Sequence, residues 1–243
     1  MSKQKYIHIT DHDLVAALIQ YLLQNMESRL EFNRSKNILS LRNDSFDKVL
    51  DVRLPLYLRP LEDDTVHTII ERLKKPDSPH YVLLLIQAGY AAMAVATPRT
   101  ILKHKTIAKY MVRKKQGKAQ ITHLKTKGKS RAGSRIRLAN TVLFFEEINE
   151  RLHEWLQAYE LNRIIYHCTP QLWGMLYDTR IKPPFDKKDT RLIKIPEYVH
   201  RPTFKELTRI NQLIKKSVVK IYRESYISAI HDIMRSVKQD DIL

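Results

Sequence analysis

The feature that most constrains the fold is an apolar stretch over residues 81–96, interrupted by Gln87 and Gly89. It is shorter than the roughly 20 residues that a helix needs to cross a bilayer. The run over residues 81–86 is continuously apolar, which is typical of a strand buried on both faces. Gly89 favours a turn, and residues 90–96 can return as a second strand. The stretch therefore predicts two neighbouring buried strands.

The apolar spacing further along the chain alternates between strand and helix. Residues 100–112 can form a third strand, so that three strands would follow one another in an antiparallel meander. Apolar residues at intervals of three and four, from Leu138 to Leu156, then predict an amphipathic helix over residues 135–159. The pattern ends with a strand at 163–168, a helix at 170–177, a strand at 191–195 and a long helix from Pro202 to about Lys238.

This order of elements predicts a mixed α/β domain. Three meander strands followed by alternating helices and strands is the order of a ribonuclease-H-like sheet, although a different mixed α/β sheet would fit the same order. We expect this domain to cover residues 78–215. The end of the predicted long helix would form a C-terminal helical extension over residues 216–243.

Residues 1–76 are expected to form a separate small α+β region. Thr10 is typical of a helix N-cap, and apolar residues follow it at helical spacing. A hairpin over residues 38–58 and a short helix over residues 62–74 come next. No motif that carries chemistry is visible in this region, so we expect it to dock or brace the chain.

Charge is concentrated in one part of the chain. The formal net charge is +17 and the pI is about 9.9. No Asp or Glu occurs from Ser78 to Phe145, where 14 Lys and Arg are found. A solvated face normally mixes both signs, so this segment indicates contact with a polyanion. Nucleic acid is the first candidate and an anionic membrane surface the second.

The single cysteine and the N-terminal residues limit the kinds of site that the chain can form and the compartment in which we expect it. Cys168 is the only cysteine, which excludes internal disulfides and zinc sites made of cysteine clusters. It sits in an apolar run, so we expect a buried structural thiol. Trp155 and Trp173 have apolar neighbours on predicted helices and are expected in the core. No apolar signal-peptide core follows Met1, so we expect a cytoplasmic protein.

The candidate site is the segment from Tyr110 to Gln120. A strand would deliver Tyr110 and Arg113 to one end of the sheet, and Gly117 allows a turn or a close approach to a ligand. Arg113 can bind a phosphate with two parallel hydrogen bonds. Further cations and one histidine that can contact RNA follow this glycine or flank it, namely Lys114, Lys115, Lys118, His123, Lys125, Lys127, Lys129, Arg131, Arg135 and Arg137.

Two interpretations of this segment stay open on the residues alone. A flexible basic loop can bind RNA without reacting on it, and an isolated Gly-x-x-Gln is a weak signal for catalysis. His123 is close to Gln120 and can act as a general base, or it can simply contact RNA or solvent. Tyr110 can hydrogen-bond RNA or pack on the sheet.

The segment resembles a known family loop. It is similar to the catalytic loop of the eukaryotic-type peptide-chain release factors, and more so to the release-factor-like tRNA endonucleases of ribosome quality control, the family of the ankyrin-repeat and zinc-finger peptidyl-tRNA hydrolase. Residues 201–207 and 135–140 also resemble family segments. The likeness covers about Tyr81 to Leu213, and the matching loop positions are Tyr110, Val112, Arg113, Lys115, Gly117, Ala119 and Gln120.

The resemblance implies a function and assigns roles. A ribosome-associated factor would free stalled nascent chains by cutting tRNA near its 3′ CCA end, with Gln120, Gly117, Arg113 and Tyr110 as catalytic residues. The partner would be a large ribosomal subunit carrying peptidyl-tRNA, and we expect a monomer. Met111 replaces the usual threonine, and neither ankyrin repeats nor zinc-finger cysteines are present.

Other functions stay possible at this point. The same loop could hydrolyse the ester of peptidyl-tRNA, as a release factor does, or the chain could bind the ribosome without catalysis. A two-metal nuclease needs clustered carboxylates that begin on the first strand, and residues 78–145 supply none. We therefore expect cleavage without a metal and without any other cofactor.

Overall fold

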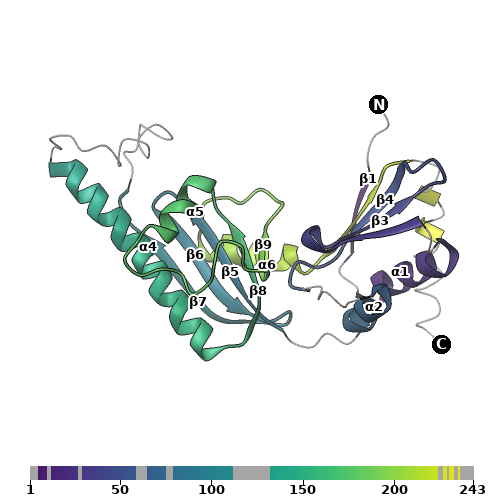
Figure 1. The fold of residues 1–243 in the computed structure, drawn as a ribbon, viewed down its shortest axis with the longest axis horizontal. Helices are drawn as coiled ribbons and strands as arrows, with labels where there is room; N and C mark the ends of the chain where they lie inside the picture. Colours follow the sequence, from purple (N-terminus) through teal and green to yellow (C-terminus); the bar gives the residue numbers. More distant parts are fainter. Residues whose placement is uncertain are drawn as a thin grey trace. The chain divides into compact units, whose positions relative to one another are not determined.

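The computed structural model describes residues 5–9, 12–26, 29–58, 65–74, 79–111, 132–223, 227–228, 230–232 and 235 (Figure 1). The chain divides into two compact units. One unit combines Met1–Pro79 with Gln212–Leu243, and the other is His80–Asn211. In the described part of the chain, no helix has the length and apolarity that a membrane crossing requires.

The unit formed by His80–Asn211 is built on a five-stranded mixed sheet. Its order is β7-β6-β5-β8-β9. The strand β6 is antiparallel to both β5 and β7, whereas β8 is parallel to β5 and β9 is parallel to β8. The predicted meander of three strands is confirmed. The strands are β5 (His80–Gln87), β6 (Tyr90–Ala96), β7 (Ile101–Ala108), β8 (Leu161–His167) and β9 (Leu192–Lys194).

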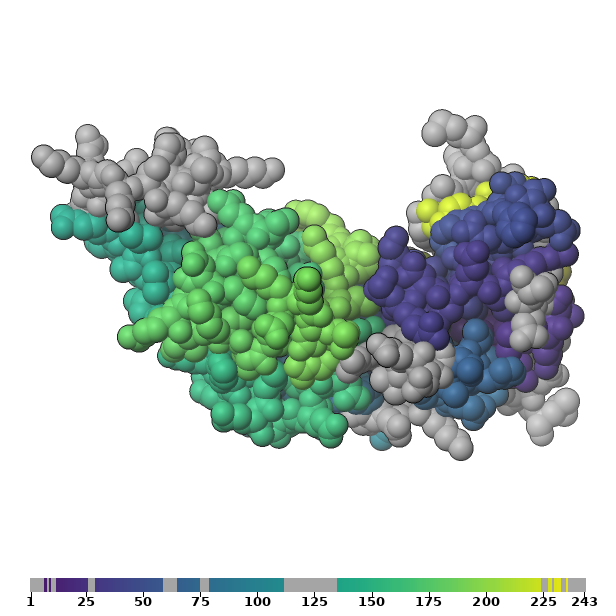
Figure 2. Space-filling view, viewed as in Figure 1, coloured from purple at the N-terminus to yellow at the C-terminus, as the bar shows by residue number. Residues whose placement is uncertain are grey.

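Helices cover both faces of this sheet. Side chains alternate between the two faces of a strand, and Val82, Leu84 and Ile86 share one core cluster with α4 (Ala132–Ala158) and α5 (Pro170–Tyr177). Tyr81 points to the opposite face, where its hydroxyl donates to Asn211 Oδ1 of α6 (Phe204–Ile214) at 2.7 Å. The space-filling view shows α4, α5 and the chain after α5 covering one side of the sheet (Figure 2).

The helix predicted over residues 135–159 is confirmed as α4, but its predicted apolar stripe is only partly buried. Phe145, Ile148, Leu152 and Trp155 are in the core, whereas Leu138 is exposed. The reason is visible in Figure 1, where the first turns of α4 extend beyond the sheet. The apolar stripe therefore predicts burial correctly for the part of α4 that covers the sheet, but not for its first turns.

The prediction of one long helix from Pro202 to about Lys238, and with it a purely helical extension after residue 215, is wrong. The helix α6 ends at Ile214, and β10 (Ser217–Ile221) follows. The β-branched pair Val218 and Val219 favours a strand over a helix. Val219 pairs with Ile7 on one side and with Val52 on the other, so both neighbours of β10 lie far away in the sequence.

The other unit holds a second, antiparallel sheet of order β1-β10-β4-β3-β2. The predicted hairpin is confirmed as β3 and β4, and the two predicted helices are confirmed as α1 (His12–Met26) and α2 (Val66–Lys74). Thr10, the predicted N-cap of α1, lies outside the described residues. The strands besides β10 are β1 (Lys5–Ile9), β2 (Leu30–Asn33), β3 (Ile38–Arg42) and β4 (Lys48–Arg53).

Candidate functional site

The predicted site residues fall into two groups. Tyr110, Arg135 and Arg137 are described by the structure, on either side of the segment of residues 112–131. The remaining predicted residues lie outside the described part of the chain, and their roles stay predictions: Arg113, Lys114, Lys115, Gly117, Lys118, Gln120, His123, Lys125, Lys127, Lys129 and Arg131. The described geometry therefore concerns the two ends from which this segment starts and to which it returns.

The strand β7 leaves the sheet past Gly89. Gly89 has a φ of +80°, in the turn between β5 and β6, and its carbonyl accepts a hydrogen bond from the Lys109 N–H at 3.0 Å. A Cβ atom at Gly89 would lie 2.6 Å from the Lys109 carbonyl oxygen. The predicted turn is thus present, and glycine is required there both by the backbone conformation and by the close approach of Lys109.

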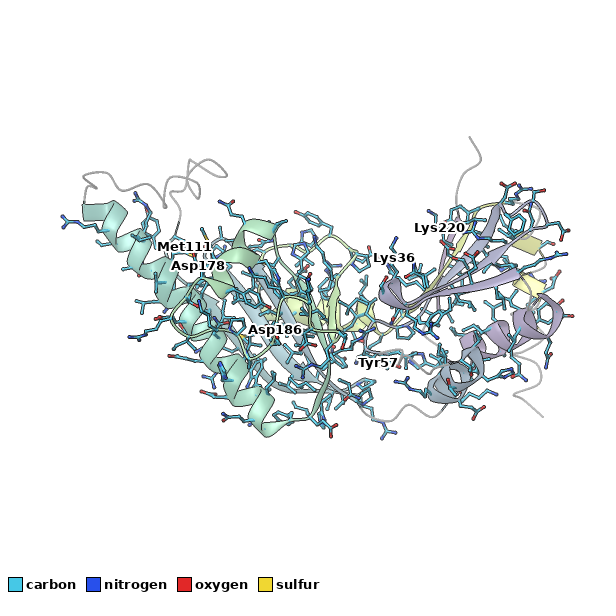
Figure 3. All side chains as sticks on the ribbon, viewed as in Figure 1. Lys36, Tyr57, Met111, Asp178, Asp186 and Lys220 are labelled. Atoms are coloured by element: carbon cyan, nitrogen blue, oxygen red, sulfur yellow. The ribbon has the colours of Figure 1, made fainter. Side chains whose placement is uncertain are left out.

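Tyr110 and Met111 point in opposite senses at this exit. The Tyr110 side chain is 53% exposed, whereas Met111 is buried in the core between the sheet and α4. Asn140 of α4 donates from Nδ2 to the Tyr110 carbonyl oxygen at 3.1 Å. Figure 3 labels Met111 beside α4. Of the two interpretations of Tyr110, this exposure favours the one in which its ring is available to a ligand.

Glu147 of α4 holds two of the basic residues of β7. Its Oε1 pairs with Lys105 Nζ at 3.2 Å, and its Oε2 pairs with Lys109 Nζ at 2.9 Å. Burial would raise the pKa of Glu147, but the hydrogen bonds and charges of Lys109 and Lys105 together hold that pKa below its usual value. These two lysines therefore serve to attach β7 to α4, rather than being available to phosphates as the charge pattern alone implied.

The two described arginines of the predicted RNA contact differ in exposure. Arg135 is exposed and lies in the first turn of α4. Arg137 is 5% exposed. Its predicted contact with RNA would require it to leave this position, so Arg135 is the better candidate of the two.

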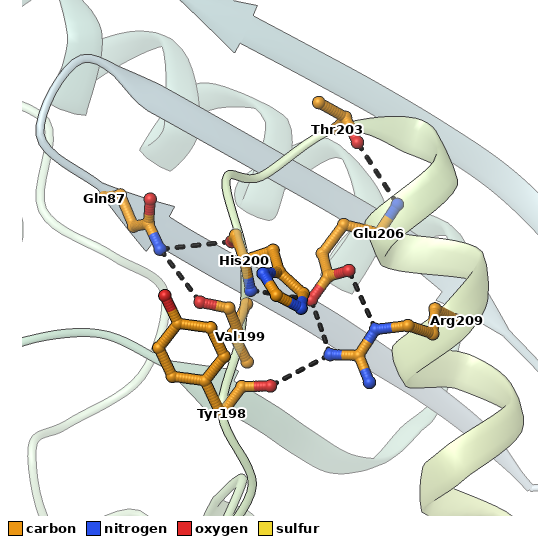
Figure 4. Close-up of polar contacts among 7 residues, drawn as sticks. All are labelled: Gln87, Tyr198, Val199, His200, Thr203, Glu206 and Arg209. Atoms are coloured by element: carbon orange, nitrogen blue, oxygen red, sulfur yellow. Dashed lines mark hydrogen bonds and ion pairs between the residues drawn. The ribbon is translucent and has the colours of Figure 1, made fainter.

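The second sequence segment that pointed to function, residues 201–207, begins α6 and is held by Glu206 (Figure 4). Thr203 caps the helix, accepting from the Glu206 N–H at 3.2 Å. The Glu206 carboxylate accepts from the His200 N–H at 2.8 Å, and from Nε and Nη2 of Arg209 at 2.9 Å and 2.7 Å. Arg209 Nη2 also donates to the Tyr198 carbonyl at 2.9 Å. The chain before α6 is thus fixed by a charged pair.

The same chain segment is attached to the sheet by Gln87. Its Nε2 donates to the carbonyls of Val199 and His200, each at 3.1 Å. Next to it, the Arg201 guanidinium lies 3.8 Å from the centroid of the Tyr90 ring. Tyr90 pairs with Ala108 at the end of β7. The two sequence segments therefore meet at one edge of the sheet.

At that edge of the sheet lie the carboxyl ends of all the strands that run in the same direction as β5. Strands β5, β8 and β9 are parallel, and β7 runs the same way because β6 is antiparallel to both β5 and β7. In open α/β sheets, ligands bind outside the carboxyl ends of the strands. The carboxyl ends here carry Gln87, Tyr110 and His167, and the turn to β6 adds Tyr90.

His167 ends β8 and Cys168 follows it at this edge, and the thiol does not have the properties of a nucleophile. Cys168 is buried, as predicted, and burial raises the pKa of its thiol to about 12. Burial and the charge of Lys194 lower the pKa of His167. Its buried Nδ1 has no hydrogen-bond partner among the described residues.

A group of three or more His, Cys, Asp or Glu side chains that could hold a metal ion is not found in the described part of the chain.

Sequence reasoning missed the residues that position the site. Gln87 and Glu147 act on segments far from them in the chain, and no local pattern indicates those contacts. Asn140 lies in the stretch 135–140 that resembles the family, but its contact with Tyr110 was not predicted. Glu206 is different, because Thr203 and Glu206 have the spacing of a capping box. That spacing predicts the bond from the Glu206 N–H to Thr203, whereas the carboxylate accepts here from the His200 N–H and from Arg209.

Comparison with known proteins gives consistent matches. A family model described as Bacteroidetes VLRF1 release factor matches residues 81–222. A protein named tRNA endonuclease ANKZF1 from Homo sapiens is 30% identical over 172 residues, which are 69% of this chain and 23% of that protein. Its counterpart from Mus musculus is 28% identical over 159 residues, 64% of this chain and 21% of that protein. The chain thus spans about a fifth of the length of these curated relatives.

Among solved structures, one titled Vms1 mitochondrial localization core aligns with 85% of this chain and 82% of its own chain, with a TM-score of 0.44 and 16% identity.

Proposed function

Because this chain belongs to the Bacteroidetes VLRF1 release factor family, we propose that it frees nascent peptides from ribosome-bound peptidyl-tRNA by cutting the tRNA near its 3′ CCA end. The observation that carries the proposal is the acid-free basic segment with Gly117 and Gln120, which starts at the exposed Tyr110 beside a strand-end edge. The name of the ANKZF1 relatives, tRNA endonuclease, supports a cut in the tRNA.

The proposed reaction is a transesterification within the tRNA. The 2′-hydroxyl of one nucleotide loses its proton as its oxygen attacks the adjacent phosphorus in line. The bond from phosphorus to the 5′ oxygen of the next nucleotide breaks, and that oxygen takes up a proton, so that no proton is gained or lost overall. The products are a 2′,3′-cyclic phosphate on the tRNA and a peptide that keeps a few nucleotides. Gln120 would orient the reacting oxygen, while Arg113 and Lys115 neutralise the phosphate.

We propose that this cut needs no metal or other cofactor. The strands of the meander, which would carry the first ligands of a two-metal site, have no carboxylate in their sequence. Positioning and neutralisation of phosphate charge would then supply most of the rate. His123 remains a candidate general base that the chemistry does not require.

The assignment of the sheet as ribonuclease-H-like belongs to the same proposal. The order β7-β6-β5-β8-β9 has the three meander strands on one side and the two crossover strands on the other, with β6 alone in the opposite direction. This arrangement supports the assignment. The substrate would be a large ribosomal subunit with peptidyl-tRNA, met by a monomer of this chain in the cytoplasm.

A second candidate is hydrolysis of the ester between peptide and tRNA. The description of the matched family as a release factor favours it. In that reaction Gln120 would help to position a water molecule at the ester, and the tRNA would keep its full length. The size of the tRNA product separates the two reactions.

The test follows the tRNA and the peptide when the protein meets stalled large-subunit peptidyl-tRNA. We expect tRNA shortened at its 3′ end, in buffer with or without EDTA. Gln120→Ala should lower the rate by about a hundredfold or more, the usual effect of removing one group that stabilises the transition state. Binding to the subunit should change little, because a neutral residue contributes little to an affinity dominated by charge.

Gln116→Ala is the matched control, since Gln116 is a glutamine of the same basic segment outside the Gly117 to Gln120 loop. It should cut at close to the normal rate. Release of peptide from full-length tRNA would establish the second candidate instead. Binding without either product, unchanged by Gln120→Ala, would leave a non-catalytic ribosome-binding protein.

A further inference from the structure

Strands β6 and β7, together with α6 and the residues that lead into it, present two ring contacts, one of which pairs an aromatic ring with a cation. The Phe204 side chain is 47% exposed, and its ring lies 4.3 Å from the His104 ring, centroid to centroid, with a tilt of 36°. The second pair is Arg201 on Tyr90 at 3.8 Å. We refer to Tyr90, Arg201, His104 and Phe204 as the aromatic–basic platform.

Strand geometry places both pairs on the same face. Tyr90 pairs with Ala108, and His104 pairs with Ala94, four residues further along β6. Because side chains alternate, positions an even number of residues apart point to the same side of the sheet, and four residues of strand span about 13 Å. This is the face that α6 covers, so the platform lies next to α6 and away from α4.

The surface between the two pairs carries small, exposed side chains. Thr106 and Ala108 lie on the same face of β7 as His104, and both are exposed. Because Thr106 and Ala108 are small, their side chains project less from the sheet than the rings of Tyr90 and His104 do. A flat group such as a nucleobase can lie between or on such rings without displacing protein atoms.

The platform is also free of competing acids in its own segments. No Asp or Glu occurs from Ser78 to Phe145 or from Tyr198 to Lys205. Glu206, which follows, is buried and already pairs with Arg209. Cations beside aromatic rings, without carboxylates, are typical of surfaces that bind single-stranded nucleic acid.

The platform is held in place before any ligand arrives. Gln87 fixes Val199 and His200, and Glu206 accepts from the His200 N–H. Arg201 is the next residue, so its position over Tyr90 is set by these bonds. Rigid binding groups lose less entropy when a ligand binds, which makes this a surface suited to a ligand rather than an incidental cluster.

We propose that the aromatic–basic platform binds the unpaired nucleotides at the 3′ end of the tRNA by stacking, and so guides them to the basic segment that starts at Tyr110. This inference rests on the proposed function for its substrate, and adds the residues that recognise it. Arg201 and Phe204 act as binding residues: they hold unpaired bases and do not take part in bond breaking.

The test compares two fluorescent RNA minihelices that share one acceptor-stem duplex. One ends in unpaired 3′ nucleotides, made with 2′-deoxyribose so that the proposed nucleophile is absent, and the other is blunt. Binding to the full-length protein is measured by fluorescence anisotropy. We expect the tailed RNA to bind about tenfold more tightly or better, since stacking of a base on an aromatic side chain contributes at this scale.

Substitutions then assign the preference to the platform. Phe204→Ala and Arg201→Ala should each lose most of the preference for the tail and leave affinity for the blunt duplex nearly unchanged. Arg201→Lys should also lose it, because lysine keeps the charge without the planar group. Phe204→Tyr should keep it. Phe46→Ala and Arg34→Ala remove an exposed phenylalanine and an arginine that lies over a phenylalanine ring, both in the other unit, and are the matched controls.

Three results would overturn the inference: equal affinity of the normal protein for both RNAs, a tail preference that survives Phe204→Ala combined with Arg201→Ala, or an equal loss for both RNAs in those variants. Thermal melting of each variant separates unfolding from loss of binding. This measurement involves no cleavage, so failure of the platform and failure of the proposed reaction are separate results.

Discussion

At the scale of single residues, Glu206 and Glu154 offer a direct comparison. Each pairs with an arginine three positions away, Glu206 with Arg209 and Glu154 with Arg151. Glu206 is 7% exposed and Glu154 is 57% exposed. The hydrogen bonds of Arg209 hold the pKa of Glu206 below its ordinary value of 4.5, against the opposing effect of burial and with help from the His200 N–H. Because Glu206 is buried, its pair with Arg209 should contribute to the stability of the fold, whereas the exposed pair of Glu154 with Arg151 should contribute little.

We predict that Glu206→Gln lowers the free energy of unfolding by about 1–3 kcal/mol at pH 7, because a buried charged hydrogen-bond network loses its charge. Glu154→Gln should cost about 0.5 kcal/mol or less. Chemical denaturation followed by circular dichroism measures both. Equal losses in the two variants would contradict the structural role given to Glu206.

The same comparison has a pH dependence with a defined sign. The folded state lowers the pKa of Glu206, so its charge stabilises the fold at pH values above the ordinary pKa, and that contribution disappears as the pH falls through the folded-state pKa. The stability difference between the normal protein and Glu206→Gln should therefore shrink below about pH 4.5.

At the scale of elements, β10 decides the fold of the smaller sheet. It lies between β1 and β4, and its Val219 is fully buried. Tyr222, just after the strand, donates to Asp51 Oδ2 of β4 at 2.7 Å, where Ser40 also donates to the Asp51 carboxylate. Without β10, β1 and β4 would each lose a hydrogen-bonded neighbour, and the sheet would be cut in two.

A pair of truncations tests this role. A chain ending at Lys216 lacks β10, and we expect residues 1–79 to lose protection in hydrogen exchange and to become sensitive to protease. A chain ending at Arg223 keeps β10 and Tyr222 and should retain most of that protection. If both chains protect residues 1–79 equally, β10 is not required for that sheet.

At the scale of the whole molecule, the segment from Ser78 to Phe145 differs from the rest of the chain in its charge, because it has basic residues and no acidic ones. The 14 cations from Ser78 to Phe145 stand without a single acid, while the remaining residues carry 29 Lys and Arg against 26 Asp and Glu. Two of the 14, Lys105 and Lys109, are paired with Glu147. The affinity for RNA should therefore come from residues 110–137 far more than from the net charge of the chain.

We predict that RNA affinity falls linearly on a plot of log affinity against log salt, as expected when phosphate contacts release counterions. Lys127→Gln combined with Lys129→Gln should reduce the slope by about 1.4, at about 0.7 for each phosphate contact of a single strand. Lys187→Gln combined with Lys188→Gln removes two exposed lysines elsewhere and should leave the slope unchanged. An equal change from both pairs would assign the binding to net charge alone.

The local part of this fold followed from the sequence by itself. The meander, the turn at Gly89 and the helix α5 depend on periodicity and on turn residues close together in the chain. The same is true of the basic segment and its glutamine, because a motif and the lack of acids are properties of consecutive residues. Cys168, predicted as buried from its apolar neighbours, belongs to this class as well.

The tertiary structure decided what distant segments do to one another. The β-branched pair Val218 and Val219 favours a strand at residues 217–221, but only the tertiary structure places that strand between β1 and β4. Gln87 meets Val199, Asn140 meets Tyr110, and Glu147 meets two lysines of β7 only once the sheet has formed. Such contacts join residues that are separated by tens of positions, and no local pattern encodes which distant partner will be adjacent. Packing makes that choice, and through it brings Arg201 to Tyr90, near the end of β7, and Phe204 to His104 within β7.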